Sequence, residues 1–141
     1  MPEIDSELEL ALNYLDHNKD ESLKRLFDIL KIPSISTQEK YSKDCLNAAN
    51  WFVEQLQDIG FDASIRETNG HPMVVAHFEQ EGPHFLFYGH YDVQPIDPIE
   101  LWNHDPFEPK IEKSHNGEII KARGASCLLY TSDAADEWLR G

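Results

Sequence analysis

The sequence has 141 residues, of which 40% are hydrophobic and 11% aromatic, and its formal net charge is −14. This length and composition fit one soluble domain with a core of its own. The acidic balance repels nucleic acid and anionic membranes, so we expect neither as a partner. No apolar run approaches the roughly 20 residues that a membrane-spanning helix needs.

The two cysteines, Cys45 and Cys127, are far apart in the sequence and do not form the framework of a disulfide-stabilised secreted protein. The N-terminus is acidic and lacks the apolar segment of a signal peptide. We therefore expect a cytoplasmic protein whose thiols are reduced.

Three amphipathic helices are predicted in the first part of the chain. The first covers residues 4–16, and the second begins at residues 20–23, which can cap it, and ends before Pro33. The third covers residues 41–59, and Gly60 follows it where a left-handed cap is favoured. The buried face of the third helix is expected to hold Cys45, Ala48, Ala49, Phe52, Val53, Leu56 and Ile59.

The hydrophobic period changes to two after the third helix. Residues 61–68 and 73–78 predict two strands, and the short connection at Asn69-Gly70 makes the pair antiparallel. A second turn signal, Asn116-Gly117, predicts another hairpin. Helices followed by closely spaced strands indicate an α/β fold with helices packed on a mixed sheet.

The stretch from Phe85 to Pro95 joins an apolar run to a polar end. Phe85–Tyr88 is typical of a buried strand because it is short, continuous and rich in aromatic residues. His90 and Asp92 follow two positions apart, so in an extended chain both side chains point to the same side of the sheet. This pattern suits a metal site in which one imidazole nitrogen binds the metal and the carboxylate holds the other N–H or binds metal itself. The alternative is a strand-end histidine that pairs with a carboxylate and binds no metal.

Other candidate groups point less directly to chemistry. Cys45 lies on the predicted buried face of a helix, so we interpret it as a core residue and not as a nucleophile. His71, His77 and His84 fall on strands or turns, and we expect no metal role for them. The loop at residues 96–109 contains two aromatic residues and three prolines, and it either clamps the core or forms the wall of a substrate site.

Three segments, in the same order and spacing, resemble the zinc-dependent exopeptidases and deacylases. They are Tyr88 to Pro95, Trp102 with residues 105–109, and residues 122–126, and the helix end at residues 31–36 also matches. The family includes carnosinase-like dipeptidases, glutamate carboxypeptidase, aminoacylase, acetylornithine deacetylase and succinyl-diaminopimelate desuccinylase. The resemblance covers about residues 8–126 and is greatest to the dipeptidase branch.

The resemblance implies a co-catalytic site with two zinc ions. It makes His90 a ligand of one zinc and Asp92 the catalytic carboxylate that orients its ring. In such a site the two metals activate a bridging water and polarise the scissile carbonyl, and a glutamate acts as general base. The resemblance also implies small peptides or N-acyl amino acids as substrates, a cytoplasmic location and a homodimeric complete protein.

The sequence departs from the family pattern after Ser126. In the family this element is followed by Asp-Asp-Lys-Gly, which supplies the aspartate that bridges both metals, whereas Cys127-Leu-Leu-Tyr follows here. Back-translation of residues 127–137 gives a DNA string that resembles a transposase-type sequencing adapter. We therefore interpret residues 127–141 as an adapter-derived tail and residues 1–126 as the truncated N-terminal part of the catalytic domain.

This interpretation leaves three classes of function open. The leading one is a metal-dependent hydrolase of dipeptides or small peptides, with an N-acyl amino acid deacylase as the alternative within the family. A chain without the bridging aspartate is expected to bind zinc weakly and to lack peptidase activity, because one histidine cannot build a tetrahedral zinc site. A non-catalytic binding protein on the same fold would explain the departure after Ser126. A cysteine hydrolase would need Cys45 to be accessible.

Overall fold

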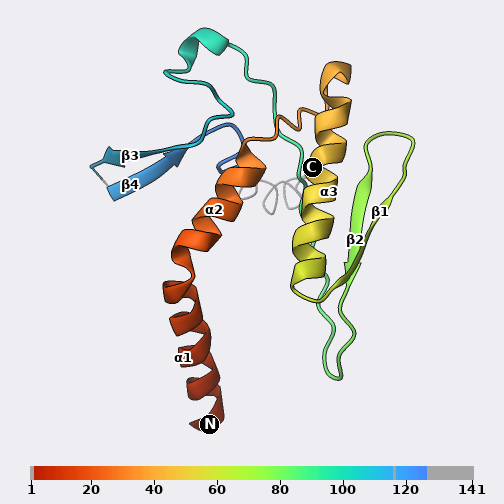
Figure 1. Cartoon of the computed structure of the whole chain (residues 1–141), viewed down its shortest axis with the longest axis vertical. Coiled ribbons are helices and arrows are strands. Elements are labelled where there is room, and N and C mark those ends of the chain that lie inside the picture. Colours follow the sequence, from red (N-terminus) through yellow and green to blue (C-terminus); the bar gives the residue numbers. More distant parts are fainter. Residues whose placement is uncertain (1, 116, 127–141) are drawn as a thin grey trace, which may run out of the picture.

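The computed structural model describes residues 2–115 and 117–126 (Figure 1). In chain order its elements are α1 (Pro2–His17), α2 (Lys19–Leu30), a 3₁₀ helix (Glu39–Tyr41), α3 (Ser42–Asp58), β1 (Asp62–Arg66), β2 (Met73–His77), a second 3₁₀ helix (Ile99–Leu101), β3 (Lys110–Ser114) and β4 (Gly117–Lys121). The predicted α/β class is confirmed. The predictions for residues 127–141 lie outside the described residues.

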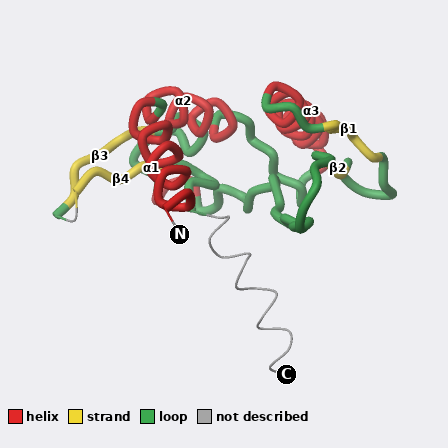
Figure 2. The backbone as a smooth tube through the Cα atoms, turned by 90° about the horizontal axis from the view of Figure 1, so that it is seen from below, coloured by secondary structure: helices red, strands yellow, loops and turns green. Residues whose placement is uncertain are grey.

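The helices lie in two groups. α1 and α2 follow one another as a long arm, while α3 lies against the β1–β2 hairpin (Figures 1 and 2). The β3–β4 hairpin lies on the other side of α2 from α3 (Figure 1). Of the helices described, none combines the length and the apolar composition that a membrane crossing requires.

The core forms where α3 meets β1 and the loop after α2. Cys45, Ala48 and Ala49 of α3 are buried there, together with Ile35 and Ala63. Small side chains on this face let the helix approach its neighbours closely, and the prediction of Cys45 as a core residue is confirmed.

The buried face of α3 ends before Ile59, the last residue that the sequence placed on it. Ile59 is 63% exposed, so its place on the buried face is a wrong prediction. α3 ends at Asp58, and Ile59 takes the cap position with φ −98° and ψ 11°. Its side chain therefore no longer follows the direction that the helical period gives.

Gly60 ends α3 as the sequence predicts. Its φ is +94°, which glycine adopts without the steric cost of a side chain. The N–H of Gly60 donates to the carbonyl of Gln57 at 2.9 Å, and the N–H of Phe61 donates to that of Leu56 at 3.0 Å. These two bonds form a Schellman motif, which turns the chain toward β1.

The start of α2 differs from the prediction. α2 begins at Lys19, and the residue before it, Asn18, makes no side-chain capping bond. The Asn18 amide donates instead to the carbonyl of Tyr14 at 2.8 Å. Because α1 runs almost directly into α2, there is no separate helix start at Asp20 to cap, and Asp20 lies within the first turn.

Both predicted hairpins are confirmed. β1 pairs antiparallel with β2, with Ile65 opposite Val74, and β3 pairs antiparallel with β4, with Ile111 opposite Ile120. Among the described residues these strands form two separate two-stranded sheets and not the one mixed sheet that the sequence led us to expect.

The apolar run Phe85–Tyr88 is not a buried strand, and this prediction is wrong. The four side chains are 79, 97, 92 and 84% exposed in chain order. An apolar run is buried only where another element covers it, and no strand of the described chain pairs with this one. The polar residues that follow are nevertheless held in place.

Candidate metal centre

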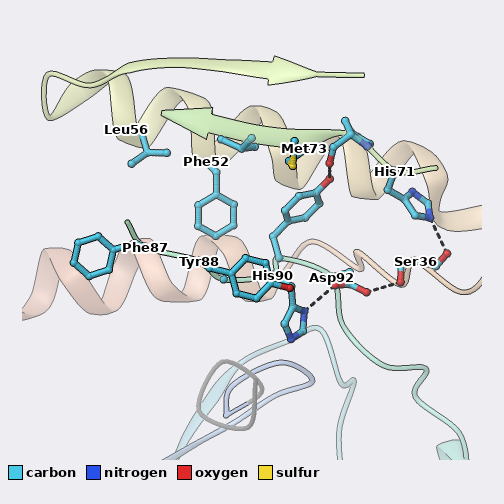
Figure 3. A pocket seen from close by; sticks show the side chains of 13 residues that line it. Ser36, Phe52, Leu56, His71, Met73, Phe87, Tyr88, His90 and Asp92 are labelled. Atoms are coloured by element: carbon cyan, nitrogen blue, oxygen red, sulfur yellow. Dashed lines mark hydrogen bonds and ion pairs between the residues drawn. The ribbon is translucent and has the colours of Figure 1, made fainter. Parts of the chain in front are cut away.

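His90 and Asp92 lie side by side directly after the exposed run (Figure 3). The Nδ1 atom of His90 is 2.7 Å from Oδ1 of Asp92. The two side chains are 25% and 39% exposed, so the pair is partly shielded from water. The structure thus brings together the two residues that the i, i+2 spacing singled out.

The hydrogen bond determines where the imidazole carries its proton. Burial alone would raise the pKa of Asp92, but hydrogen bonds from Ser36 and His90 and the charge of His90 outweigh burial and hold the pKa below its usual value. The ionised carboxylate can only accept hydrogen bonds, so Nδ1 of His90 carries a proton. In the neutral ring this leaves a lone pair on Nε2, which is the form that binds metal.

The other ring nitrogen fits a metal ligand. Nε2 of His90 is buried and has no hydrogen-bond partner in the described structure. A buried polar atom without a partner is unfavourable, and a metal ion on this nitrogen would supply one. Within residues 2–115 and 117–126, no group of three or more His, Cys, Asp or Glu side chains comes together. The described residues therefore offer one nitrogen ligand and its orienting carboxylate.

A cavity of about 660 Å³ lies between α3, β2 and the segment that carries the pair. In Figure 3, Phe52, Leu56 and Met73 line it, and His90 and Asp92 stand at its edge. Its size falls in the range of small-molecule sites, which are mostly apolar with a few polar groups. The cavity can therefore accept an apolar group of a small molecule beside the histidine.

The three other histidines considered in the sequence, His71, His77 and His84, have contacts of their own. Nε2 of His71 is 2.7 Å from the carbonyl oxygen of Ser36, and the rings of His77 and His84 stack with centroids 6.2 Å apart. The absence of a metal role for these three histidines stays a prediction.

Cys45 is poorly placed for nucleophilic chemistry. Its burial, followed by the negative charges of Asp92 and Asp44, raises the pKa of the thiol. Because the thiolate is the reactive form, this environment suppresses reactivity. The structure therefore disfavours the cysteine hydrolase.

The loop at residues 96–109 makes clamping contacts. The indole N–H of Trp102 donates to the carbonyl of Ile96 at 3.0 Å. The guanidinium of Arg123 lies 5.0 Å from the centre of the Trp102 ring. The backbone N–H of Arg123 donates to the carbonyl of Pro106 at 2.7 Å. Of the two roles considered for this loop, these contacts favour the structural clamp.

The loop after α2 contributes two hydroxyl groups that the sequence pattern did not predict. The hydroxyl of Ser36 donates to Oδ2 of Asp92 at 2.5 Å, and the hydroxyl of Ser34 donates to the carbonyl of Tyr91 at 2.7 Å. No periodicity or spacing connects residues so far apart. The only available signal was that residues 31–36 belong to the family resemblance, which gave them no role.

Comparison with known proteins adds to this geometry. No family model matches the chain. The chain is 28% identical over 134 residues to the Cys-Gly metallodipeptidase DUG1 of Candida albicans, covering 84% of this chain and 27% of the relative. It is 33% identical over 115 residues to the succinyl-diaminopimelate desuccinylase of Thiobacillus denitrificans, covering 82% of this chain and 26% of the relative.

A solved structure agrees with these relatives. The di-peptidase Dug1p of Saccharomyces cerevisiae matches with a TM-score of 0.67 and 28% identity, over 79% of this chain and 26% of that one. The chain is therefore similar to metallodipeptidases and to succinyl-diaminopimelate desuccinylases. It spans about a quarter of the length of the relatives that it matches.

Proposed function

We propose that the chain carries part of the active site of a metal-dependent hydrolase that cleaves an amide or peptide bond of dipeptides or small peptides. The observation that carries this proposal is the pair of His90 and Asp92, in which the carboxylate holds Nδ1–H and leaves Nε2 without a partner. Relatives that are metallodipeptidases support it.

In this proposal each residue of the pair has a distinct role. His90 holds a metal through Nε2, and Asp92 fixes the ring and raises the basicity of the ligand. Zinc is the metal that the family resemblance favours, with two ions in the complete enzyme, and imidazole nitrogen is a common zinc ligand. Zinc held by His90 and by ligands of the complete enzyme would supply Lewis-acid chemistry for the scissile carbonyl and an activated water. The complete protein is proposed to be a cytoplasmic homodimer.

A second candidate is an N-acyl amino acid deacylase. The desuccinylase relatives favour it, because their name states that they remove a succinyl group from succinyl-diaminopimelate. Both candidates use the same bond chemistry and differ in the group that the site accepts.

The test begins with the source DNA. Amplification across the codon of Ser126 is expected to show Asp-Asp-Lys-Gly and a long downstream frame. The extended protein, loaded with Zn²⁺, is then assayed with Cys-Gly and with N-succinyl-diaminopimelate, and a chelator should abolish the activity.

The outcomes separate the candidates. Hydrolysis of the dipeptide supports the dipeptidase, and hydrolysis of the succinyl compound alone supports the deacylase. Absence of both activities in a zinc-loaded extended protein would refute the hydrolase. A frame that continues with Cys-Leu-Leu-Tyr and stops would favour the non-catalytic binding protein.

A further inference from the structure

A chain of hydrogen bonds runs from the loop after α2 to His90 (Figure 3). The hydroxyl of Ser36 donates to Oδ2 of Asp92 at 2.5 Å, and Nδ1 of His90 donates to Oδ1 of the same carboxylate at 2.7 Å. Ser36 and Asp92 are 56 positions apart in the sequence. The contact therefore joins two distant segments at the histidine.

Each oxygen of Asp92 has its own donor. A carboxylate at neutral pH accepts hydrogen bonds and does not donate, so two separate donors hold its plane in one orientation. Without the Ser36 hydroxyl, the carboxylate would keep one donor. Since the Asp92 side chain is 39% exposed, water would compete for the freed oxygen and the carboxylate would turn. The imidazole would then lose the fixed partner of its Nδ1–H.

Ser36 is itself held from a third segment. Nε2 of His71 is 2.7 Å from the Ser36 carbonyl oxygen, and since a carbonyl only accepts, this nitrogen carries the proton. This hydrogen bond fixes the backbone that presents the Ser36 hydroxyl to the carboxylate.

We propose that Ser36 is a positioning residue that acts through Asp92 to hold the imidazole of His90 with Nε2 ready for a divalent cation such as Zn²⁺. His71 supports it by holding the Ser36 backbone. This inference rests on the proposed function for its metal and extends that function to the loop after α2.

The experiment observes the ring nitrogens of His90 by NMR in the ¹⁵N-labelled 141-residue chain without metal. In the wild type the proton is expected on Nδ1. In Ser36→Ala we expect a mixture that includes the Nε2–H form. Ser36→Thr keeps the hydroxyl and should restore the Nδ1–H form.

Ser34→Ala is the matched control. It removes a hydrogen bond of similar length from the same loop, but the acceptor is the Tyr91 backbone and not the carboxylate. It should lower the free energy of unfolding and leave the His90 proton on Nδ1. Should Ser36→Ala not fold, Ser36→Cys gives the same measurement, because a thiol is nearly the same size and a weak donor.

The proposal is overturned if Ser36→Ala, or Ser36→Cys where Ser36→Ala does not fold, leaves the His90 proton on Nδ1 as in the wild type. The position of the proton is measured without metal and without substrate. Failure of this inference is therefore distinguishable from failure of the extended protein to hydrolyse either substrate, which would overturn the proposed function alone.

Discussion

The two halves of residues 85–93 differ in what surrounds them: the first, apolar half is exposed, and the second, polar half is held by hydrogen bonds. Residues 85–88 carry four large apolar side chains, and the structure leaves them exposed. Residues 89–93 are more polar, yet hydrogen bonds from Ser34 and Ser36 hold them against the loop after α2. The difference shows that an apolar segment needs a surface that covers it, whereas a polar segment is ordered by a few partners at the correct distance.

The largest effect is expected for His90 in the polar half, and His84, which directly precedes the apolar half, serves as the comparison. In the extended protein, His90→Ala removes the proposed metal ligand, so Zn²⁺ affinity should fall about 100-fold or more, beyond the loss of a merely orienting group. His84→Ala, beside the apolar half, should leave the affinity within twofold. Isothermal titration of both variants measures this, and equal losses would show that the polar half is not a specific site.

Gly124 lies against Val93, the last residue of the polar half, so a substitution at Gly124 tests the packing there. Its φ is +89°, and a Cβ there would lie 2.8 Å from Cγ1 of Val93. Gly124→Ala should therefore lower the free energy of unfolding by about 1–3 kcal/mol. Gly82, before the apolar half, has φ +127° but nothing within 4 Å of a Cβ. In urea unfolding, Gly82→Ala should lose less, and an equal loss would mean that the Val93 contact is unimportant.

Cys45 reports on the core beneath the polar half. In a Cys127→Ser background, labelling of the folded protein by a thiol reagent at pH 8 should be about tenfold or more slower than in urea. The reason is burial and the raised pKa of the thiol, which keeps the thiolate fraction low. Labelling in both states should rise with pH as thiolate forms. Equal rates would revive the cysteine hydrolase.

The smallest effect is expected in the apolar half. Leu86 is exposed, so Leu86→Ala should change the free energy of unfolding by no more than about 0.5 kcal/mol. Leu30 is buried, and the same substitution there should cost about 2–5 kcal/mol. A large loss for Leu86→Ala in thermal unfolding would show that the run is covered in solution.

Local pattern was sufficient for much of the fold. Helical spacing predicted three helices, Gly60 predicted the cap of α3, and two Asn-Gly pairs predicted both hairpins. Each of these depends on neighbours within a few positions, which a sequence displays directly. The pairing of His90 with Asp92 was predictable for the same reason.

Features that depend on distant residues were not predictable in this way. The exposure of Phe85–Tyr88 depends on which elements lie nearby, and hydrophobicity does not contain that information. The roles of Ser36 and His71 depend on contacts across 56 and 35 positions. Hydroxyl and imidazole groups that join separate segments leave no periodic signal.

The contact between Ser36 and Asp92 also bears on the order of folding. It closes a loop that contains α3 and the β1–β2 hairpin. Closing a long loop costs chain entropy, so contacts of high sequence separation form slowly compared with helices and hairpins. We therefore expect His90 to acquire its oriented ring only after the intervening elements have assembled, so that partly folded chains lack the arrangement that we propose for metal capture.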